Sequence, residues 1–174
     1  KIGSPFCPQC GRPIKAWSAQ GIVAEISSKY SGKKIRILAP LISGRIGTYE
    51  ELFAKLKKSG FVKVRVDGKL RGLDAVPKLV RYVKHTIELF VDELTADAGE
   101  KERLTEAVEL ALAQSRGLVA VEAGGKEPAL YSEKNACPSC GISFPELEPR
   151  LFSFNTPFGA CPECAGLGVK IEID

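Results

Sequence analysis

Apolar and polar positions in the first third of the chain change from helical to strand spacing. Apolar residues recur at roughly helical intervals at Trp17, Ile22, Val23 and Ile26. This pattern predicts a helix that ends before the polar turn "SGKK". The segment "KIRILAPLI" follows as a predicted strand, because Ile35 and Ile37 alternate onto one face before a more buried run.

A second helix is predicted after residue 48. Thr48 and Glu51 have the spacing of a capping box, in which a hydroxyl and a carboxylate satisfy free N–H groups at a helix start. Its apolar stripe is Leu52, Phe53 and Leu56. Gly60 is expected to end this helix.

The segment "FVKVRVDGKLRGL" predicts a β-hairpin. Asp67-Gly68 is a favoured two-residue turn. Lys63 and Arg65 are expected on the strand face opposite an alternating apolar set, Val62, Val64 and Val66.

The remaining pattern completes a domain over residues 13–135. "KHTIELFVDEL" is a predicted strand, and "GEKERLTEAVELALAQSRG" is an amphipathic helix that Gly117 should cap. The segments "GLVAVEA" and "ALYSE" are further strands. The order helix, strand, helix, hairpin, strand, helix, strands predicts an α/β (α+β) fold, a small mixed-sheet domain with flanking helices.

Composition bounds the class of protein. The 174 residues are 44% hydrophobic and 26% charged, which is typical of a globular protein, and no apolar run is long enough to span a bilayer. The net charge of +4 allows contact with nucleic acid or an acidic protein, or a basic surface without either. The chain starts at Lys1 without a signal peptide and has no methionine, so we expect a piece of a longer protein.

All six cysteines occur in Cys-x-x-Cys pairs: Cys7 and Cys10, Cys137 and Cys140, Cys161 and Cys164. Such pairs form either a disulfide framework or zinc knuckles. Two knuckles twenty residues apart supply the closed four-thiolate set of a structural zinc, so we predict zinc at the last four cysteines, in a module over residues 136–174. A closed site has no position for water or substrate, and its role is architectural.

The first pair, within residues 1–12, makes only half a site. A second metal there would need ligands from elsewhere in a parent protein, or an exchange with one of the later pairs. His85 is a weaker candidate for a third ligand than for a strand residue with local partners.

Motifs for catalysis are missing from the sequence. It contains no GxxxxGK[ST] phosphate loop and no convincing nucleophile–base pair. These observations favour a binding module and argue against an enzyme in its own right.

Several blocks of the chain resemble the UvrA family, the ATPase subunit of the bacterial excinuclease of nucleotide excision repair. The similar blocks are "CPQCG", "LAPLISGRIG", "GFVKVRVDGKLRGL", "KHTIELFVDEL", "ACPSCG" and "ELEPRLFSFNTPFGACPECAGLG". A weaker likeness links "CPECAGLG" to the zinc repeats of DnaJ-type chaperones, which have four such repeats against one here.

The resemblance implies a fragment that docks UvrB through the body between the knuckles and contains a structural zinc. It also implies a cytoplasmic parent protein that forms a homodimer and contacts DNA and ATP, without membrane association. The ATP-binding loop and signature motif of the family lie outside this sequence, so the fragment alone should not hydrolyse ATP.

The residues expected at partner surfaces follow from the resemblance and from charge. Lys63, Arg65 and Arg45 are the predicted contacts to acidic side chains of UvrB, against the alternative of a solvated strand face. Arg150 lies among phenylalanines between the last knuckles and is a candidate DNA contact, although those rings more often form a small core. Glu93 stands where the family often has a basic residue, which suggests as an alternative a divergent paralogue that contacts DNA without binding UvrB.

Overall fold

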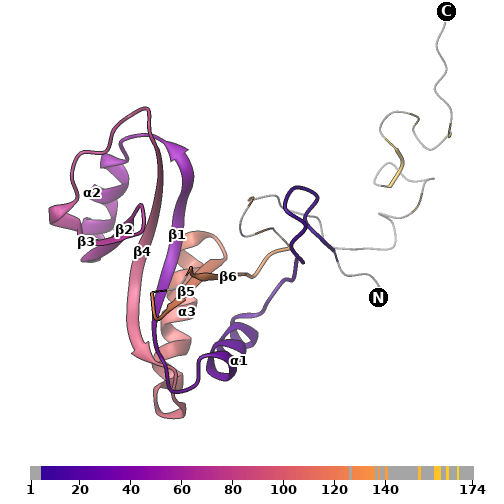
Figure 1. Ribbon diagram of the computed structural model, residues 1–174, viewed down its shortest axis with the longest axis horizontal. Coiled ribbons are helices and arrows are strands. Elements are labelled where there is room, and N and C mark those ends of the chain that lie inside the picture. Colours follow the sequence, from indigo (N-terminus) through magenta and orange to yellow (C-terminus); the bar gives the residue numbers. More distant parts are fainter. Residues whose placement is uncertain are drawn as a thin grey trace, which may run out of the picture. The chain divides into compact units, whose positions relative to one another are not determined.

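A computed structural model defines the fold of the chain (Figure 1). It describes residues 5–125 and 127–135 and the single positions or short runs 137, 140, 153, 159–161, 164 and 168. The chain divides into two compact units, Lys1–Ser143 and Phe144–Asp174. The boundaries predicted at residues 12 and 135 stay predictions.

The first unit is built on a six-stranded sheet. Its strands are β1 (Lys34–Ile46), β2 (Lys63–Val66), β3 (Lys69–Gly72), β4 (Lys84–Thr95), β5 (Leu118–Ala123) and β6 (Ala129–Ser132). Their order is β3-β2-β4-β1-β5-β6, and all their pairings are antiparallel. The α+β class is thereby confirmed. Long β1 and β4 form the centre of the sheet.

Three helices contribute to one hydrophobic core: α1 (Ala19–Lys29), α2 (Glu50–Lys58) and α3 (Lys101–Ser115). The core contains Ile22 and Ile26 of α1, Phe53 of α2 and Leu104 and Val108 of α3. It also contains the strand residues of one alternation, among them Ile35, Ile37, Val64, Ile87, Leu89, Val119 and Val121. The helices therefore cover one face of the sheet, and the residues of the other alternation form a face without a described helix, which we call the open face.

The predicted hairpin is confirmed by β2 and β3. Asp67 and Gly68 both have positive φ, 48° and 78°. A two-residue turn with this backbone matches the twist of the paired strands. Val64 and Val66 enter the core, whereas Val62 precedes β2 and is exposed.

The chain enters and leaves this fold at adjacent points. Trp17 N–H donates to the Ser132 carbonyl oxygen at 2.9 Å, just before α1 and at the end of β6. The Trp17 and Tyr131 rings meet edge to face with centroids 5.6 Å apart. These contacts hold the segments preceding α1 and following β6 side by side.

Two predicted helix ends differ from the structure. The capping box at Thr48 and Glu51 is wrong: Tyr49 is the N-cap, has a left-handed backbone (φ 55°) and makes no side-chain cap bond. Its hydroxyl instead donates to the Ile46 carbonyl oxygen at 3.0 Å, which sets the turn between β1 and α2. At the end of α3, Arg116 takes the left-handed C-cap position (φ 63°) ahead of Gly117 (φ 97°).

Candidate functional site

Four cysteines from opposite ends of the first unit form a candidate metal centre. The sulfur atoms of Cys7, Cys10, Cys137 and Cys140 all lie within 4.8 Å of one another. Cys7 and Cys137 are buried, Cys140 is half-buried and Cys10 is exposed. Cys10 Sγ and Cys137 Sγ are 3.5 Å apart. All four are free thiols, and their arrangement could hold a metal ion.

A tight turn positions the first pair. Cys7 N–H donates to the Arg12 carbonyl oxygen, and Gly11 N–H donates back to the Cys7 carbonyl oxygen, both at 2.8 Å. Gly11 has a left-handed backbone (φ 68°), for which glycine is the least strained residue. A bridge between Phe6 and Pro13 closes the base of the turn. Both thiols of the pair are thus presented on one side of a small loop.

The second pair lies close to the first because the segment before α1 and the segment after β6 are adjacent. Cys137 follows β6 by five residues, and Cys10 precedes Trp17 by seven. The hydrogen bond between Trp17 and Ser132 brings these two segments together. Cys140 N–H also donates to Cys137 Sγ at 3.4 Å, which orders the second pair.

The donor set fits a tetrahedral zinc ion. Zn–S bonds of about 2.3 Å place the four sulfurs about 3.8 Å apart, a spacing compatible with the observed cluster. Burial raises the pKa of the Cys7 thiol, but hydrogen bonds from the backbone of Cys10 and Gln9 outweigh it and lower this pKa to about 7. Contact with the Cys10 thiol and burial raise the pKa of Cys140 to about 12. Metal binding would therefore displace a firmly held proton.

The structure combines the cysteines differently from the spacing-based set. Cys137 and Cys140 meet Cys7 and Cys10, which is the exchange of partners left open above. Cys161 and Cys164 belong to the second unit, and their sharing of an ion with Cys137 and Cys140 stays a prediction. One tetrahedral ion has four ligands, so the Cys137–Cys140 pair can serve only one of these sets at a time.

The open face of the sheet has a continuous series of ion pairs. Arg65 donates to both carboxylate oxygens of Glu88, from Nε at 2.5 Å and from Nη2 at 2.7 Å. Its Nη1 lies 3.1 Å from Glu122 Oε2, which Arg36 also approaches at 3.8 Å. Negative and positive side chains therefore alternate along the series, in the order Glu88 of β4, Arg65 of β2, Glu122 of β5 and Arg36 of β1.

Glu93 of β4 extends this series through its ion pair with Arg36. Lys34 Nζ and Arg36 Nε each lie 2.6 Å from one of its carboxylate oxygens. These two hydrogen bonds lower the pKa of Glu93 to about 2. Glu93 is thus ionised at neutral pH and committed to two cations of its own sheet.

The predicted partner residues lie in different environments. Arg65 is buried, with 9% of its surface exposed. Its guanidinium binds Glu88 and Glu122 and so fixes the positions of these carboxylates on the open face. Lys63 is exposed beside it, with Nζ 5.5 Å from the centre of the Phe90 ring. Arg45 is exposed near the end of β1, opposite His85 of β4. Arg150 lies outside the described residues.

Sequence reasoning missed the partners of Arg65, namely Glu88 and Glu122, and the Lys34–Glu93–Arg36 group. The available signal was the alternation itself, because Arg36, Glu88 and Glu122 interrupt otherwise apolar strands. Pairing them required the strand register, which puts Arg65 opposite Glu88 and Arg36 opposite both Glu93 and Glu122.

His85 has local partners, as its strand position suggested. Its Nδ1 lies 2.8 Å from Asp67 Oδ2, and its Nε2 lies 3.1 Å from the Val80 carbonyl oxygen. The hydrogen bond to Asp67 raises the pKa of His85. His85 is therefore occupied by hydrogen bonds that fix the segment before β4.

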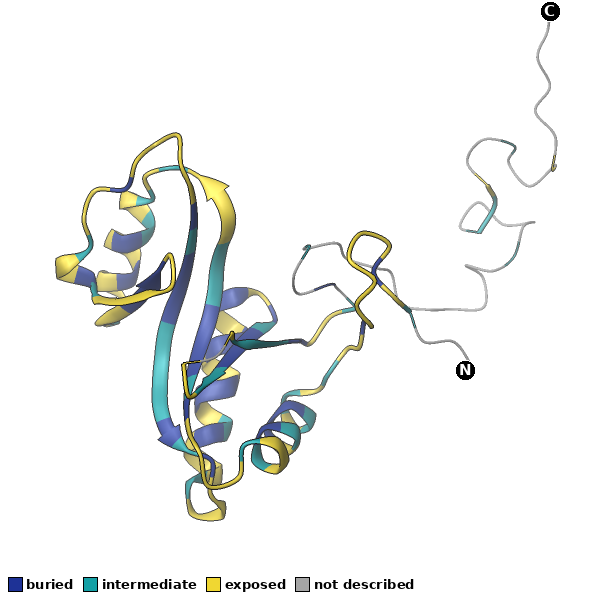
Figure 2. Ribbon diagram, viewed as in Figure 1, coloured by how far each residue is buried: buried dark blue, intermediate teal, exposed yellow. Residues whose placement is uncertain are grey.

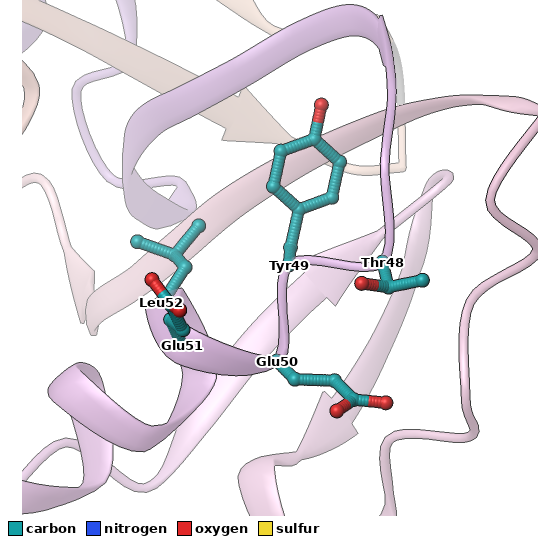
Figure 3. Close-up of a pocket in the computed structure, with 5 residues that line it drawn as sticks. All are labelled: Thr48, Tyr49, Glu50, Glu51 and Leu52. Carbon is teal, nitrogen blue, oxygen red and sulfur yellow. The ribbon is translucent and has the colours of Figure 1, made fainter.

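A pocket at the start of α2 is lined by Thr48, Tyr49, Glu50, Glu51 and Leu52 (Figure 3). Figure 3 shows the Tyr49 ring standing away from the Glu50 and Glu51 carboxylates. Both carboxylates lie in the first turn of α2, where they complement the helix dipole. The pocket is thus accounted for by the local structure of the helix start.

None of the helices in the described part of the chain is long and apolar enough to cross a membrane.

Comparison with known proteins gives consistent matches over this fold. Residues 18–124 match the model of a family described as the UvrA interaction domain. The chain is 48% identical over 174 residues to UvrABC system protein A of Halalkalibacterium halodurans, covering 100% of the chain and 18% of the relative. It is 50% identical over 175 residues to the protein of that name from Aquifex aeolicus, covering 99% of the chain and 19% of the relative. The chain therefore spans about a fifth of the length of these relatives.

Proposed function

Because the chain belongs to the UvrA interaction domain family, we propose that it is the module through which a UvrA-type ATPase docks UvrB in nucleotide excision repair. The observation that supports this most directly is the open face of the sheet. No described helix packs on it, and its charges are arranged by buried ion pairs. The proposed role is binding, with ATP and DNA chemistry belonging to the cytoplasmic, homodimeric parent protein.

The open face suits recognition of a charged partner. Its central pair, Arg65 and Glu88, is almost fully buried and holds the neighbouring side chains in place. Lys63 is an exposed cation of this face, and Arg45 is exposed near the end of β1, on the side of its partner His85. Neither makes an ion pair with the described residues, so both are available to an acidic surface. Exposed charges of this kind chiefly accelerate and orient encounter, whereas preorganised pairs limit the ordering cost of binding.

We also propose a structural zinc at Cys7, Cys10, Cys137 and Cys140. The ion would hold the two chain segments that enter and leave the domain, in addition to the Trp17–Ser132 hydrogen bond. All four coordination positions would be filled by thiolates, so the ion would be architectural.

Docking is tested by titrating the 174-residue chain against UvrB. Lys63→Glu should weaken binding about tenfold, mainly through a slower association rate. Lys55→Glu is the matched control, because it makes the same charge change on an exposed position of α2. Failure of the unmutated chain to bind UvrB, with zinc content and fold intact, would contradict the proposal.

Zinc ligation is tested by metal content of purified pairwise variants. The Cys7→Ser/Cys10→Ser protein should lose zinc from its first unit, and the Cys161→Ser/Cys164→Ser protein should keep it. The opposite outcome would restore the ligand set predicted from spacing.

The alternative function is a DNA-contacting module of a divergent paralogue that does not bind UvrB, and one observation supports its second part, the loss of UvrB binding. Glu93 occupies two cations of the open face, Lys34 and Arg36, and so lowers its positive charge. Weak UvrB binding that Glu93→Lys strengthens would favour this alternative.

A further inference from the structure

A basic and aromatic surface lies at the end of the β1–β4 ribbon. We call it the basic tip and define it by Arg45, Lys78, Arg81, Tyr82 and Lys84. All five residues are exposed, and Tyr82 exposes 81% of its surface. Figure 2 shows exposed residues along the end of β1 and the loop that leads into β4, which the pairing of Ile46 with Lys84 brings together.

The loop that presents Arg81 and Tyr82 is held at several points. Val83 N–H donates to the Val80 carbonyl oxygen at 3.2 Å, so Arg81 and Tyr82 occupy the two central positions of a tight turn. The Val80 carbonyl oxygen also lies 3.1 Å from His85 Nε2, and Leu79 is anchored in the core. These contacts hold the backbone of the loop, and so fix the positions from which the Arg81 and Tyr82 side chains project.

All the charged residues of the tip are positive. Residues 76–87 contain three Lys or Arg residues and no carboxylate, and residues 41–49 contain Arg45 and no carboxylate. The carboxylates of the adjoining turn and helix segments have partners or another role. Asp67 accepts hydrogen bonds from His85 and from Thr86 N–H, and Asp74 pairs with Lys57. Glu50 and Glu51 complement the start of α2.

The four cations of the tip differ from those of the open face. Arg36 and Arg65 are consumed by ion pairs, whereas Arg45, Lys78 and Lys84 make none with the described residues. The described contact of Arg81 is with the Tyr82 ring, 6.0 Å from its centre. Unpaired cations around an exposed aromatic ring match a polyanion whose planar groups can stack.

We infer that the basic tip binds single-stranded nucleic acid, with phosphates on its Lys and Arg residues and an unpaired base stacked on Tyr82. Base stacking on aromatic side chains tolerates any sequence, and phosphate contacts add affinity that falls with salt. The exposed Ile46, Val80 and Val83 beside the ring extend the apolar part of the surface. The carboxylates of an acidic protein segment would pair with the cations, but such a segment lacks the planar bases that stack on an exposed ring.

Arg45 is shared with the proposed docking contacts, but Arg81, Tyr82 and Lys84 are not, so variants of these three residues test this inference separately from UvrB docking. Titrating each variant against UvrB as well separates failure of one proposal from failure of the other.

The test measures binding of the 174-residue chain to a fluorescent oligothymidylate over a range of salt concentrations. Four phosphate contacts predict a slope of about −3 in a plot of log affinity against log salt. Arg81→Ala and Lys84→Ala should each reduce the slope by about 0.7. Tyr82→Ala should lower affinity about tenfold at unchanged slope, and Tyr82→Phe should retain it.

Lys55→Ala, an exposed lysine of α2 outside the tip, is the control and should bind like the unmutated chain. Three results would overturn the inference: no binding at low salt, equal effects of Lys55→Ala and Lys84→Ala, or unchanged affinity in Tyr82→Ala. Binding of an acidic peptide that depends on the tip, without binding of the oligonucleotide, would assign the surface to a protein partner instead.

Discussion

Replacing Arg65 by methionine should destabilise the domain far more than removal of a surface ion pair. The Arg65 and Glu88 side chains are 11% and 7% exposed and share two hydrogen bonds. Methionine has a similar length and keeps most of the packing but leaves the Glu88 carboxylate buried without its partner. Breaking a buried pair in this way costs about 3–5 kcal/mol. For a folded unit of this size, that corresponds to a fall in Tm of about 10–15 °C.

Arg103→Met provides the matched comparison. Arg103 also donates from two nitrogens to one carboxylate, that of Asp92, but its side chain is 52% exposed. An exposed pair is worth about 0–1 kcal/mol, so this variant should unfold close to the unmutated protein. The contrast isolates burial, because the geometry of the two pairs is alike.

Urea unfolding followed by far-UV circular dichroism measures both variants. A second substitution, Glu88→Leu in the Arg65→Met background, should recover most of the lost stability because it removes the unpaired charge. Equal losses for Arg65→Met and Arg103→Met would refute the reasoning, as would failure of Glu88→Leu to recover any stability.

Three further predictions concern single groups. Lys34 and Arg36 hold the pKa of Glu93 at about 2, below its unfolded value. The stability that Glu93 contributes should therefore be full above about pH 5 and be lost as pH falls through the folded pKa. A difference in free energy of unfolding between Glu93→Gln and the unmutated chain that does not shrink at acid pH would contradict this. Asp67 raises the pKa of His85, so this histidine should stabilise the fold fully below about pH 6.5 and lose that effect as pH rises through its folded pKa. His85 is the only histidine, so its imidazole NMR signal should titrate with a raised midpoint that Asp67→Asn lowers; a midpoint unaffected by Asp67→Asn would count against the hydrogen bond. Arg116→Gly should stabilise the chain by about 0.5–1 kcal/mol, because glycine adopts the left-handed C-cap of α3 without strain; a lower urea midpoint would show that the Arg116 side chain contributes more than its backbone costs.

Periodicity predicted the element order because each element carries its own signal. Alternation marked β2 and β4, and the Asp67-Gly68 turn fixed the hairpin between β2 and β3. The capping box failed because the turn before α2 is set by the Tyr49 hydroxyl on Ile46, a contact that depends on β1 extending to that residue. Local spacing contains no information on such a contact.

The candidate sites depend on long-range pairing and were less predictable. Cys10 and Cys137 are 127 positions apart in the sequence. They lie close together because the hydrogen bond between Trp17 and Ser132 joins the segment before α1 to the segment after β6. Arg65 was predicted as a contact to acidic side chains of UvrB, with a solvated strand face as the alternative. Its burial follows from a register that places a carboxylate of β4 directly opposite it.

The hydrogen bond between Trp17 and Ser132 has a mechanical consequence. A fold whose entering and leaving segments are joined by a main-chain hydrogen bond can be inserted into a surface turn of a larger protein, because the two ends of the insertion already lie close together. The loop-closure cost of such an insertion is then met within the inserted domain itself.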